Sequence, residues 1–162
     1  MLIPQAAVAQ LRVGVAGGPV FPVGDFGDAL ERGGHGGVVL DFGVPLFPVG
    51  LRGDLMVQRL PATEGNGQAY RHFAGTVNAR VDVLPVPLIA AYVTGGVGLY
   101  YSDYTDDPQA SSGWGTETGL NLGVGASLSL LFVRPFAELR YHRVWAEPTR
   151  TFVPLTFGLS LF

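Results

Sequence analysis

The chain has 162 residues, of which 14% are charged and 48% are hydrophobic, and its formal net charge is −3 at pH 7. Soluble globular proteins have roughly 25% charged residues, so the composition indicates a non-aqueous neighbour, and no basic run is present that could follow a nucleic-acid backbone. The absence of cysteine excludes disulfides and thiolate-based zinc sites, and the length fits one domain.

The N-terminal segment MLIPQAAVAQ contains Ala7, Val8 and Ala9 before Gln10, which is the small-residue pattern that precedes a signal peptidase site. We expect residues 1–9 to be the remnant of an export signal, with the exact cleavage site left open. Residues 10–162 then form a single domain that leaves the cytoplasm.

From residue 11 onwards, apolar residues alternate with small or polar ones, which is the period of a β-strand with two different faces. The alternation is clearest from Leu120 to Leu130, where every second residue is Leu, Val or Ala. The pattern predicts no helix of useful length. It predicts eight strands, each close to the roughly 9–11 residues that cross a bilayer, at 11–18, 35–44, 49–59, 71–83, 89–101, 119–130, 136–145 and 152–162.

The connections between these strands alternate in length. Three are tight and contain proline, at 45–48, 84–87 and 131–135, whereas the others are polar and mostly longer, at 19–34, 60–70, 102–118 and 146–150. Short turns at one end and long loops at the other are typical of a membrane-spanning meander. The predicted fold is an all-β, eight-stranded, antiparallel, up-and-down transmembrane β-barrel.

One face of the predicted strands is polar and carries charges in mid-strand. By parity this face holds four arginines and four carboxylates, together with two asparagines and a histidine: Arg12, Arg52, Arg80, Arg140, Asp41, Asp54, Asp82, Glu138, Asn78, Asn121 and His142. A narrow closed interior needs balanced charge, because an unpaired buried ion costs several kcal/mol. We therefore predict that this face forms a polar network that plugs the lumen, and that the apolar face meets lipid. The alternative is a soluble lipocalin-like barrel, in which the apolar face is inside.

Aromatic residues gather near the strand ends, which predicts two girdles at the two bilayer interfaces. The girdle toward the long loops contains Tyr70, Phe73, Tyr101, Trp114, Tyr141 and Trp145, and the girdle toward the tight turns contains Phe42, Phe47, Phe132 and Phe136.

The segments YVTGGVGLYY (92–101), TGLNLGVGASLSL (118–130), PFAELRYHRV (135–144) and FVPLTFGLSLF (152–162) resemble the small outer-membrane β-barrel family of the OmpA/OmpX type. The resemblance implies a location in the bacterial outer membrane, turns and termini in the periplasm, loops outside the cell, and assembly by the barrel insertion machinery. It also implies a non-enzymatic role as a membrane scaffold that makes surface contacts, in adhesion or envelope integrity.

The last strand departs from the family pattern. Such chains usually end on an outward-facing aromatic residue, whereas here Phe157, Leu159 and Leu161 share the outward face and Phe162 falls one residue beyond it. Either Leu161 takes the last outward place, or a bulge restores the aromatic residue.

The sequence predicts no catalytic residue, cofactor or metal. His142 and Glu138 could belong to a lipid-modifying enzyme, but no nearby serine completes a triad, and the acids of the 102–118 loop, Asp103, Asp106, Asp107 and Glu117, lack the spacing of a calcium loop. The expected partners are the lipid bilayer, the insertion machinery and an unknown extracellular partner that binds the loops, with no nucleic acid and a monomeric state. A narrow channel for small solutes is the main alternative function.

Overall fold

The structure, a computed structural model, describes residues 10–43, 49–63, 69–86, 88–104 and 115–161. Eight strands and one short helix make up this part of the chain. They are β1 (Gln10–Val23), α1 (Asp25–Ala29), β2 (Gly33–Gly43), β3 (Val49–Pro61), β4 (Ala69–Pro85), β5 (Ile89–Tyr104), β6 (Gly115–Leu128), β7 (Val133–Val144) and β8 (Arg150–Leu161).

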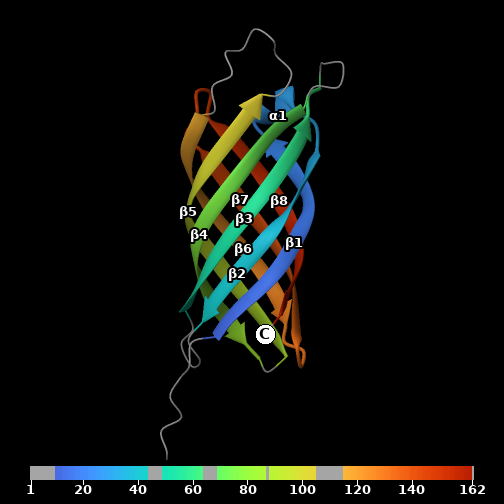
Figure 1. The fold of residues 1–162 in the computed structure, drawn as a ribbon, viewed down its shortest axis with the longest axis vertical. Coiled ribbons are helices and arrows are strands. Elements are labelled where there is room, and N and C mark those ends of the chain that lie inside the picture. Colours follow the sequence, from blue (N-terminus) through green and yellow to red (C-terminus); the bar gives the residue numbers. More distant parts are fainter. Residues whose placement is uncertain (1–9, 44–48, 64–68, 87, 105–114, 162) are drawn as a thin grey trace, which may run out of the picture.

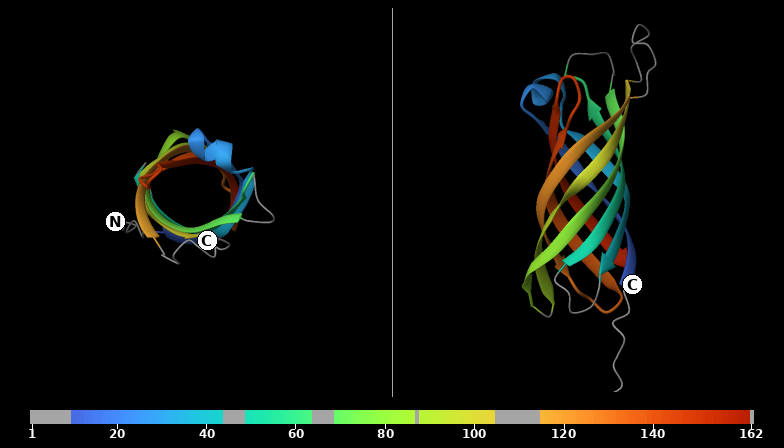
Figure 2. Two further views of the ribbon diagram at one scale, coloured as in Figure 1. Left: turned by 90° about the horizontal axis from the view of Figure 1, so that it is seen from above. Right: turned by 90° about the vertical axis from the view of Figure 1, so that its left-hand side faces the viewer.

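Each strand pairs antiparallel with its neighbours in the sequence, and β1 also pairs with β8, so the sheet closes into a barrel. Viewed along its axis, the barrel is a continuous ring of strands (Figure 2). Closure matters because a free sheet edge would leave backbone N–H and C=O groups without partners in lipid. The predicted fold class is confirmed.

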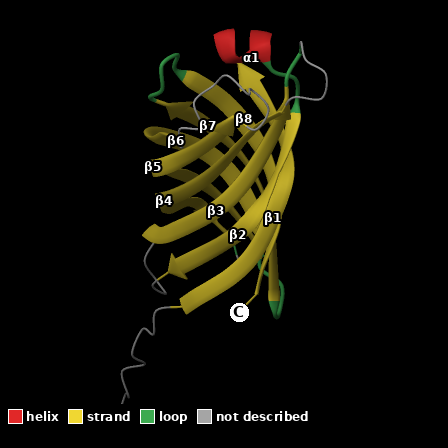
Figure 3. Cartoon of the chain, turned by 45° about the horizontal axis from the view of Figure 1, so that its top comes forward, coloured by secondary structure: helices red, strands yellow, loops and turns green. Residues whose placement is uncertain are grey.

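The two ends of the barrel differ (Figure 1). At one end, which we call the turn end, β1 starts, β8 finishes, and residues 129–132 make a tight connection between β6 and β7. At the opposite end, the loop end, α1 lies at the rim of the barrel (Figure 3). No helix in the described residues is long and apolar enough to cross a membrane.

At the loop end, every strand except β7 extends beyond the span that the sequence predicts. β1 continues through Pro19 and Pro22 to Val23, β5 continues to Tyr104, and the predicted 19–34 loop contains α1 after Gly24. Gly24 has a φ of 63°, a left-handed conformation that glycine adopts readily. Proline signals a strand end in the sequence, but it is tolerated where its missing N–H leaves no ladder bond broken.

The outer wall of the barrel is apolar and the inner wall is not. Along β3, Leu51, Leu55 and Val57 are exposed, whereas the intervening Arg52 and Asp54 are buried. The most exposed wall residues include Leu122 at 69% and Val77 at 62%. Water would have to solvate this whole apolar surface, whereas lipid would not. The soluble alternative, with its apolar face inside, is therefore wrong.

Candidate functional site: the barrel interior

The inward-facing side chains form a column with three levels. Nearest the turn end is a charged group, the turn-end cluster (Arg12, Asp41, Arg80, Asp82 and Arg134). In the middle is the charge ring (Arg52, Asp54, Glu138 and Arg140). Nearest the loop end is the aromatic plug (Val20, Leu60, Tyr70, Ala74, Tyr100, Val144 and Phe152).

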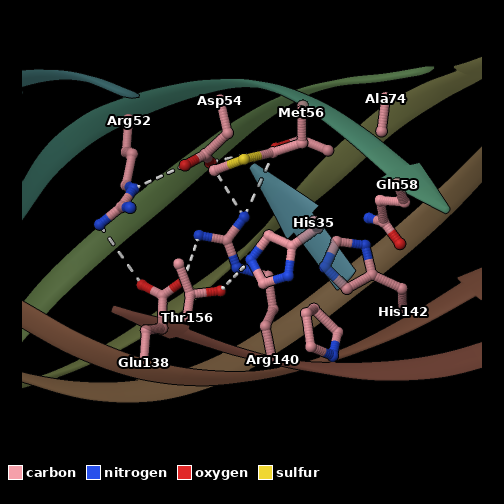
Figure 4. A pocket seen from close by; sticks show the side chains of 12 residues that line it. His35, Arg52, Asp54, Met56, Gln58, Ala74, Glu138, Arg140, His142 and Thr156 are labelled. Carbon is pink, nitrogen blue, oxygen red and sulfur yellow. Dashed lines mark hydrogen bonds and ion pairs between the residues drawn. The ribbon is translucent and has the colours of Figure 1, made fainter. Parts of the chain in front are cut away.

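The charge ring is a closed square of alternating charges (Figure 4). Arg52 Nε lies 2.9 Å from Asp54 Oδ1, and its Nη1 lies 3.5 Å from Glu138 Oε2. Arg140 completes the square, with Nη1 2.9 Å from Asp54 Oδ2 and Nη2 2.5 Å from Glu138 Oε1. All four side chains are buried. Each charge has two opposite neighbours, which offsets the cost of removing it from water.

Neutral groups hold the charge ring in place. Asp54 Oδ2 also accepts hydrogen bonds from Asn78 Nδ2 at 2.8 Å and from Thr76 Oγ1 at 3.1 Å. The Arg52 guanidinium lies 4.4 Å from the centroid of the Phe136 ring, in a cation–π contact. Phe136 fits because its neighbour across the β7–β8 ladder is Gly158, where a Cβ atom would overlap the ring.

The turn-end cluster is wetter than the charge ring. Arg80 Nε donates to Asp82 Oδ1 at 3.1 Å, and its guanidinium lies 3.7 Å from the centre of the Tyr92 ring. The Asp82 side chain is 31% exposed. Looser contacts of 4.0 Å join Asp41 to Arg80 and Arg134 to Asp82. Water at the mouth of the barrel therefore solvates part of Asp82, whereas Arg80 and Asp41 are buried.

Arg12 and Asn121 complete the set of predicted lumen residues. Arg12 is half-buried and is the cross-strand partner of Asp41, and Asn121 is buried and is the cross-strand partner of His142. All eleven side chains predicted for the lumen thus lie on the inner face.

Aromatic and apolar side chains fill much of the loop end of the lumen, beyond the polar network that the sequence predicts. Tyr100 and Phe152 are each 1% exposed, and their ring centroids lie 6.2 Å apart. Phe26 of α1 packs edge-on against Tyr70 at 5.6 Å, so the helix contacts the outer side of the plug. The chain therefore separates the charge ring from the loop-end surface by an apolar layer.

All three histidines of the chain lie inside the barrel. His142 Nδ1 and the Tyr100 hydroxyl are 2.7 Å apart, and the His142 ring stacks on Phe152 at 4.9 Å. His72 contacts the same Phe152 ring at 5.1 Å, and His35 Nε2 lies 2.9 Å from Thr156 Oγ1. Their scattered positions in the sequence hide this grouping, but their parity would have revealed it.

A hydrogen-bond network around Arg150, on the loop side of the aromatic plug, was not predicted from the sequence. Arg150 Nη1 lies 2.5 Å from Glu117 Oε2 and donates to the Tyr70 hydroxyl at 2.9 Å and to Ser102 Oγ at 3.0 Å. Glu117 therefore points inward rather than into the acidic loop with which the sequence grouped it. The side chain of Asp103, and Asp106 and Asp107, lie outside the described residues.

A small cavity lies between the charge ring and the plug (Figure 4). Its volume is about 20 Å³, and its lining includes Met56, Gln58 and His142. A space of this size accommodates about one water molecule, and it is far smaller than the roughly 300–1,000 Å³ of a small-molecule pocket.

His142 and Glu138, the pair considered for a lipid-modifying enzyme, are both buried, and Glu138 bonds Arg140. Among the described residues, the hydrogen-bond partner of the His142 ring is the Tyr100 hydroxyl rather than a serine. The described residues also include no cluster of His, Asp and Glu side chains that could hold a metal ion.

Most described residues of the predicted girdles are on the outer wall, but two are not. Exposed girdle residues are Phe73, Tyr101, Tyr141, Trp145, Phe42 and Phe132. Tyr70 and Phe136 are corrections, since both are buried inside the barrel at 6% exposure. Both residues were assigned to the girdles from their positions near strand ends alone. The alternation of side chains along the strand places both of them on the inward face. Trp114 and Phe47 lie outside the described residues.

The closing strand keeps one register. β8 pairs with β1 from Thr151 to Leu161 and with β7 from Arg150 to Leu161 without a shift. Phe157, Leu159 and Leu161 are exposed on the outer wall. Leu161 therefore takes the last outward place within the described residues, and Phe162 lies outside them.

No protein-family model matches the sequence, and a search of the curated proteins gives no match. Solved structures do match over almost the whole chain. Neisserial surface protein A (NspA) aligns with a TM-score of 0.74 and 15% identity, covering 95% of this chain and 98% of that one. The chain has the fold of the small outer-membrane barrels.

Two further solved structures support this assignment. Ail, the attachment invasion locus protein of Yersinia pestis, aligns with a TM-score of 0.57 and 14% identity, covering 94% of this chain and 96% of that one. A major outer membrane protein from Thermus thermophilus aligns with a TM-score of 0.61 and 16% identity, covering 94% of this chain and 98% of that one. Barrels with this fold and an apolar outer wall are suited to the bacterial outer membrane, which agrees with the location expected from the sequence.

Proposed function

We propose that this protein is a non-enzymatic outer-membrane barrel that conducts no solute and makes surface contacts through its loop end. The observation that carries the proposal is the charge ring, whose four buried side chains span the lumen from β3 to β7. An eight-stranded barrel has an interior just wide enough for side chains. Ion pairs of 2.5 to 3.5 Å across that interior leave little room for a passing solute.

The aromatic plug supports the same proposal independently. It adds an apolar layer on the loop side of the charge ring, and Phe26 and Leu30 pack on it from the first loop region. A hydrated ion would have to pass side chains such as Tyr100 and Phe152, which are each 1% exposed and fill the lumen at this level. In the narrow-channel alternative, both the charge ring and the aromatic plug would have to move aside before a solute could pass.

Surface contact is the role that the exposed end can perform. The names of two aligned proteins, a surface protein and an attachment invasion protein, describe that kind of role for those proteins. Ail was also solved with the heparin analogue sucrose octasulfate. The first loop of this chain carries Asp25, Asp28 and Glu31 against Arg32, so we do not extend a polyanionic ligand to it.

The proposal includes a monomeric state and assembly by the barrel insertion machinery, with the β8 strand as the segment recognised. The closed ladder between β1 and β8 supports a monomer, because no strand edge is left for a second copy.

Recording from planar bilayers tests the closed lumen. We expect purified protein to insert without steady single-channel steps, while a general porin in the same bilayers conducts. Steady conductance from the wild type that disappears when the protein is heat-denatured before insertion would refute the proposal and favour the channel.

The orientation can be tested because the chain has no cysteine. We expect Asp28→Cys, at the loop end, to react with a membrane-impermeant maleimide on intact cells. Leu131 is 85% exposed in the connection between β6 and β7 at the turn end, and Leu131→Cys should react only after lysis. The reverse labelling would place the loop end in the periplasm.

A separate variant tests the contact role. When residues 25–30 are replaced by Gly and Ser, cells that express the variant should lose surface adhesion. Retention of full adhesion would contradict a contact role for this loop.

A further inference from the structure

Three arginines interrupt the otherwise uncharged outer wall, and all three lie at the loop end. Among outward-facing strand residues with described side chains, the charged ones are Arg59 of β3, Arg71 of β4 and Arg143 of β7, and all are exposed. Arg59 lies two residues before the end of β3 at Pro61, and Arg71 lies two residues after the start of β4 at Ala69. The charges among these described side chains thus have one sign and are confined to one end.

Arg59 and Arg71 face each other directly. They are partners in the β3–β4 ladder, so both side chains leave the same face of the sheet. Cβ atoms of directly opposed residues are about 4.5–5.5 Å apart, and like charges in that position destabilise a sheet. Within the described part of the chain neither guanidinium has an ion pair. Arg71 is also the ladder partner of Asp103. The formal net charge of Arg59, Arg71 and Asp103 together is still positive.

The arginine pair lies one step beyond an apolar and aromatic row. Two residues further into the barrel wall are Val57 and Phe73, which pair with each other, and Tyr101, which pairs with Phe73. These three side chains are exposed, and two residues of strand correspond to about 6.8 Å. Aromatic residues of this kind mark the edge of the hydrocarbon core. The two guanidinium groups therefore lie at the level of the lipid headgroups.

We propose that Arg59 and Arg71 form a clamp for the phosphate group of a lipid headgroup in the leaflet at the loop end. A phosphate between the two side chains removes their mutual repulsion. Each planar guanidinium can donate two parallel N–H···O bonds to phosphate oxygens, and the two alkyl stems can lie along the apolar wall. The ligand class is a lipid with a phosphate monoester, which carries more charge than a phosphodiester.

Arg143 provides a matched control on the same wall. It is exposed and lies one residue before the end of β7, but its ladder partners are Leu120 and Thr151. No second cation faces it across either ladder, so Arg143 has the charge of the clamp residues and lies at the same end of the barrel, but it is not part of a pair.

The inference rests on the proposed membrane orientation, and its test separates the two. Full-length protein is placed in phosphatidylcholine nanodiscs that contain a minor fraction of phosphatidic acid, the monoester probe. Native mass spectrometry then counts the lipids that remain bound to the released barrel. We expect the wild type to retain phosphatidic acid selectively. In the Arg59→Gln/Arg71→Gln double variant this selectivity should fall by roughly tenfold or more, as expected for the loss of hydrogen bonds to a charged group.

Two further variants decide between a clamp and general surface charge. Arg143→Gln should keep the selectivity of the wild type, and Arg59→Lys/Arg71→Lys, which keeps the charge but not the planar forks, should lose part of it. Equal losses in Arg143→Gln and in the double Gln variant would overturn the clamp, as would full selectivity in the double Gln variant. If the Gln variant does not fold, the Lys variant decides, because full selectivity there would overturn the role of the forks.

Competition with inorganic phosphate identifies the source of the phosphate group. We expect millimolar inorganic phosphate to leave the bound phosphatidic acid in place, because the site is at headgroup depth. Displacement by free phosphate would overturn the lipid assignment. A wild type that fails to enter nanodiscs would refute the membrane proposal itself, whereas insertion without lipid selectivity would refute only the clamp.

Discussion

The Asp54→Asn substitution should be the most damaging conservative change in the barrel interior. It keeps the shape of the side chain but removes one of the two negative charges of the charge ring. Arg52 and Arg140, each 2.9 Å from an Asp54 oxygen, would then share Glu138 alone. The new amide group would also direct N–H donors at neighbours that are themselves donors.

The expected magnitude follows from burial. The side chains of the charge ring are at most 5% exposed, so water cannot replace the lost carboxylate. Removing one partner of a buried ion pair costs about 3–5 kcal/mol, and we expect a loss of this size in the free energy of unfolding. The measurement is equilibrium urea unfolding in phospholipid vesicles, followed by tryptophan fluorescence and by the faster migration of folded barrels on unheated gels.

Asp82→Asn is the matched control. Asp82 accepts from the Nε of the arginine two residues before it at 3.1 Å, as Asp54 does at 2.9 Å, but its side chain is 31% exposed. We therefore expect a loss below about 1 kcal/mol. Asp54→Asn combined with Arg140→Met leaves Arg52 and Glu138 balanced, and it should cost less than the sum of the single changes. If Asp54→Asn cost no more than Asp82→Asn, the charge ring would not be a dry and mutually dependent unit.

Two further predictions concern other parts of the wall. Arg80→Met should destabilise the barrel by about 1–3 kcal/mol, less than Asp54→Asn, because the partly exposed Asp82 can regain water; an equal or larger loss in the same urea titration would contradict a wet turn end. Gly96→Ala should destabilise by about 3 kcal/mol, because its Cβ would overlap the carbonyl oxygen of Val77, whereas at Gly53 the nearest atom is 4.0 Å away. Equal folded fractions of Gly96→Ala and Gly53→Ala on unheated gels would show that the strand separation can adjust.

Parity and position along the strand carry different amounts of information. Parity placed Arg52 and Asp54 inside and Leu51 and Leu55 outside, as the structure has them. Position along the strand suggested that Tyr70 lies at the lipid interface, but it is buried beneath α1. Parity is reliable because successive side chains of a strand must point to opposite faces, whereas a residue near a strand end can serve either face.

The local alternation of side chains therefore determined the eight strands, the two walls and the membrane setting of this protein, because a shift by one residue would have moved every apolar side chain to the wrong face. Only the tertiary structure decided which inward residues meet. Arg140 reaches Asp54 from 86 residues away, and Arg150 reaches Glu117 from 33 residues away. These pairs depend on the stagger of the strands around the closed barrel. That stagger is set by all eight ladders together and leaves no mark in the sequence around either residue.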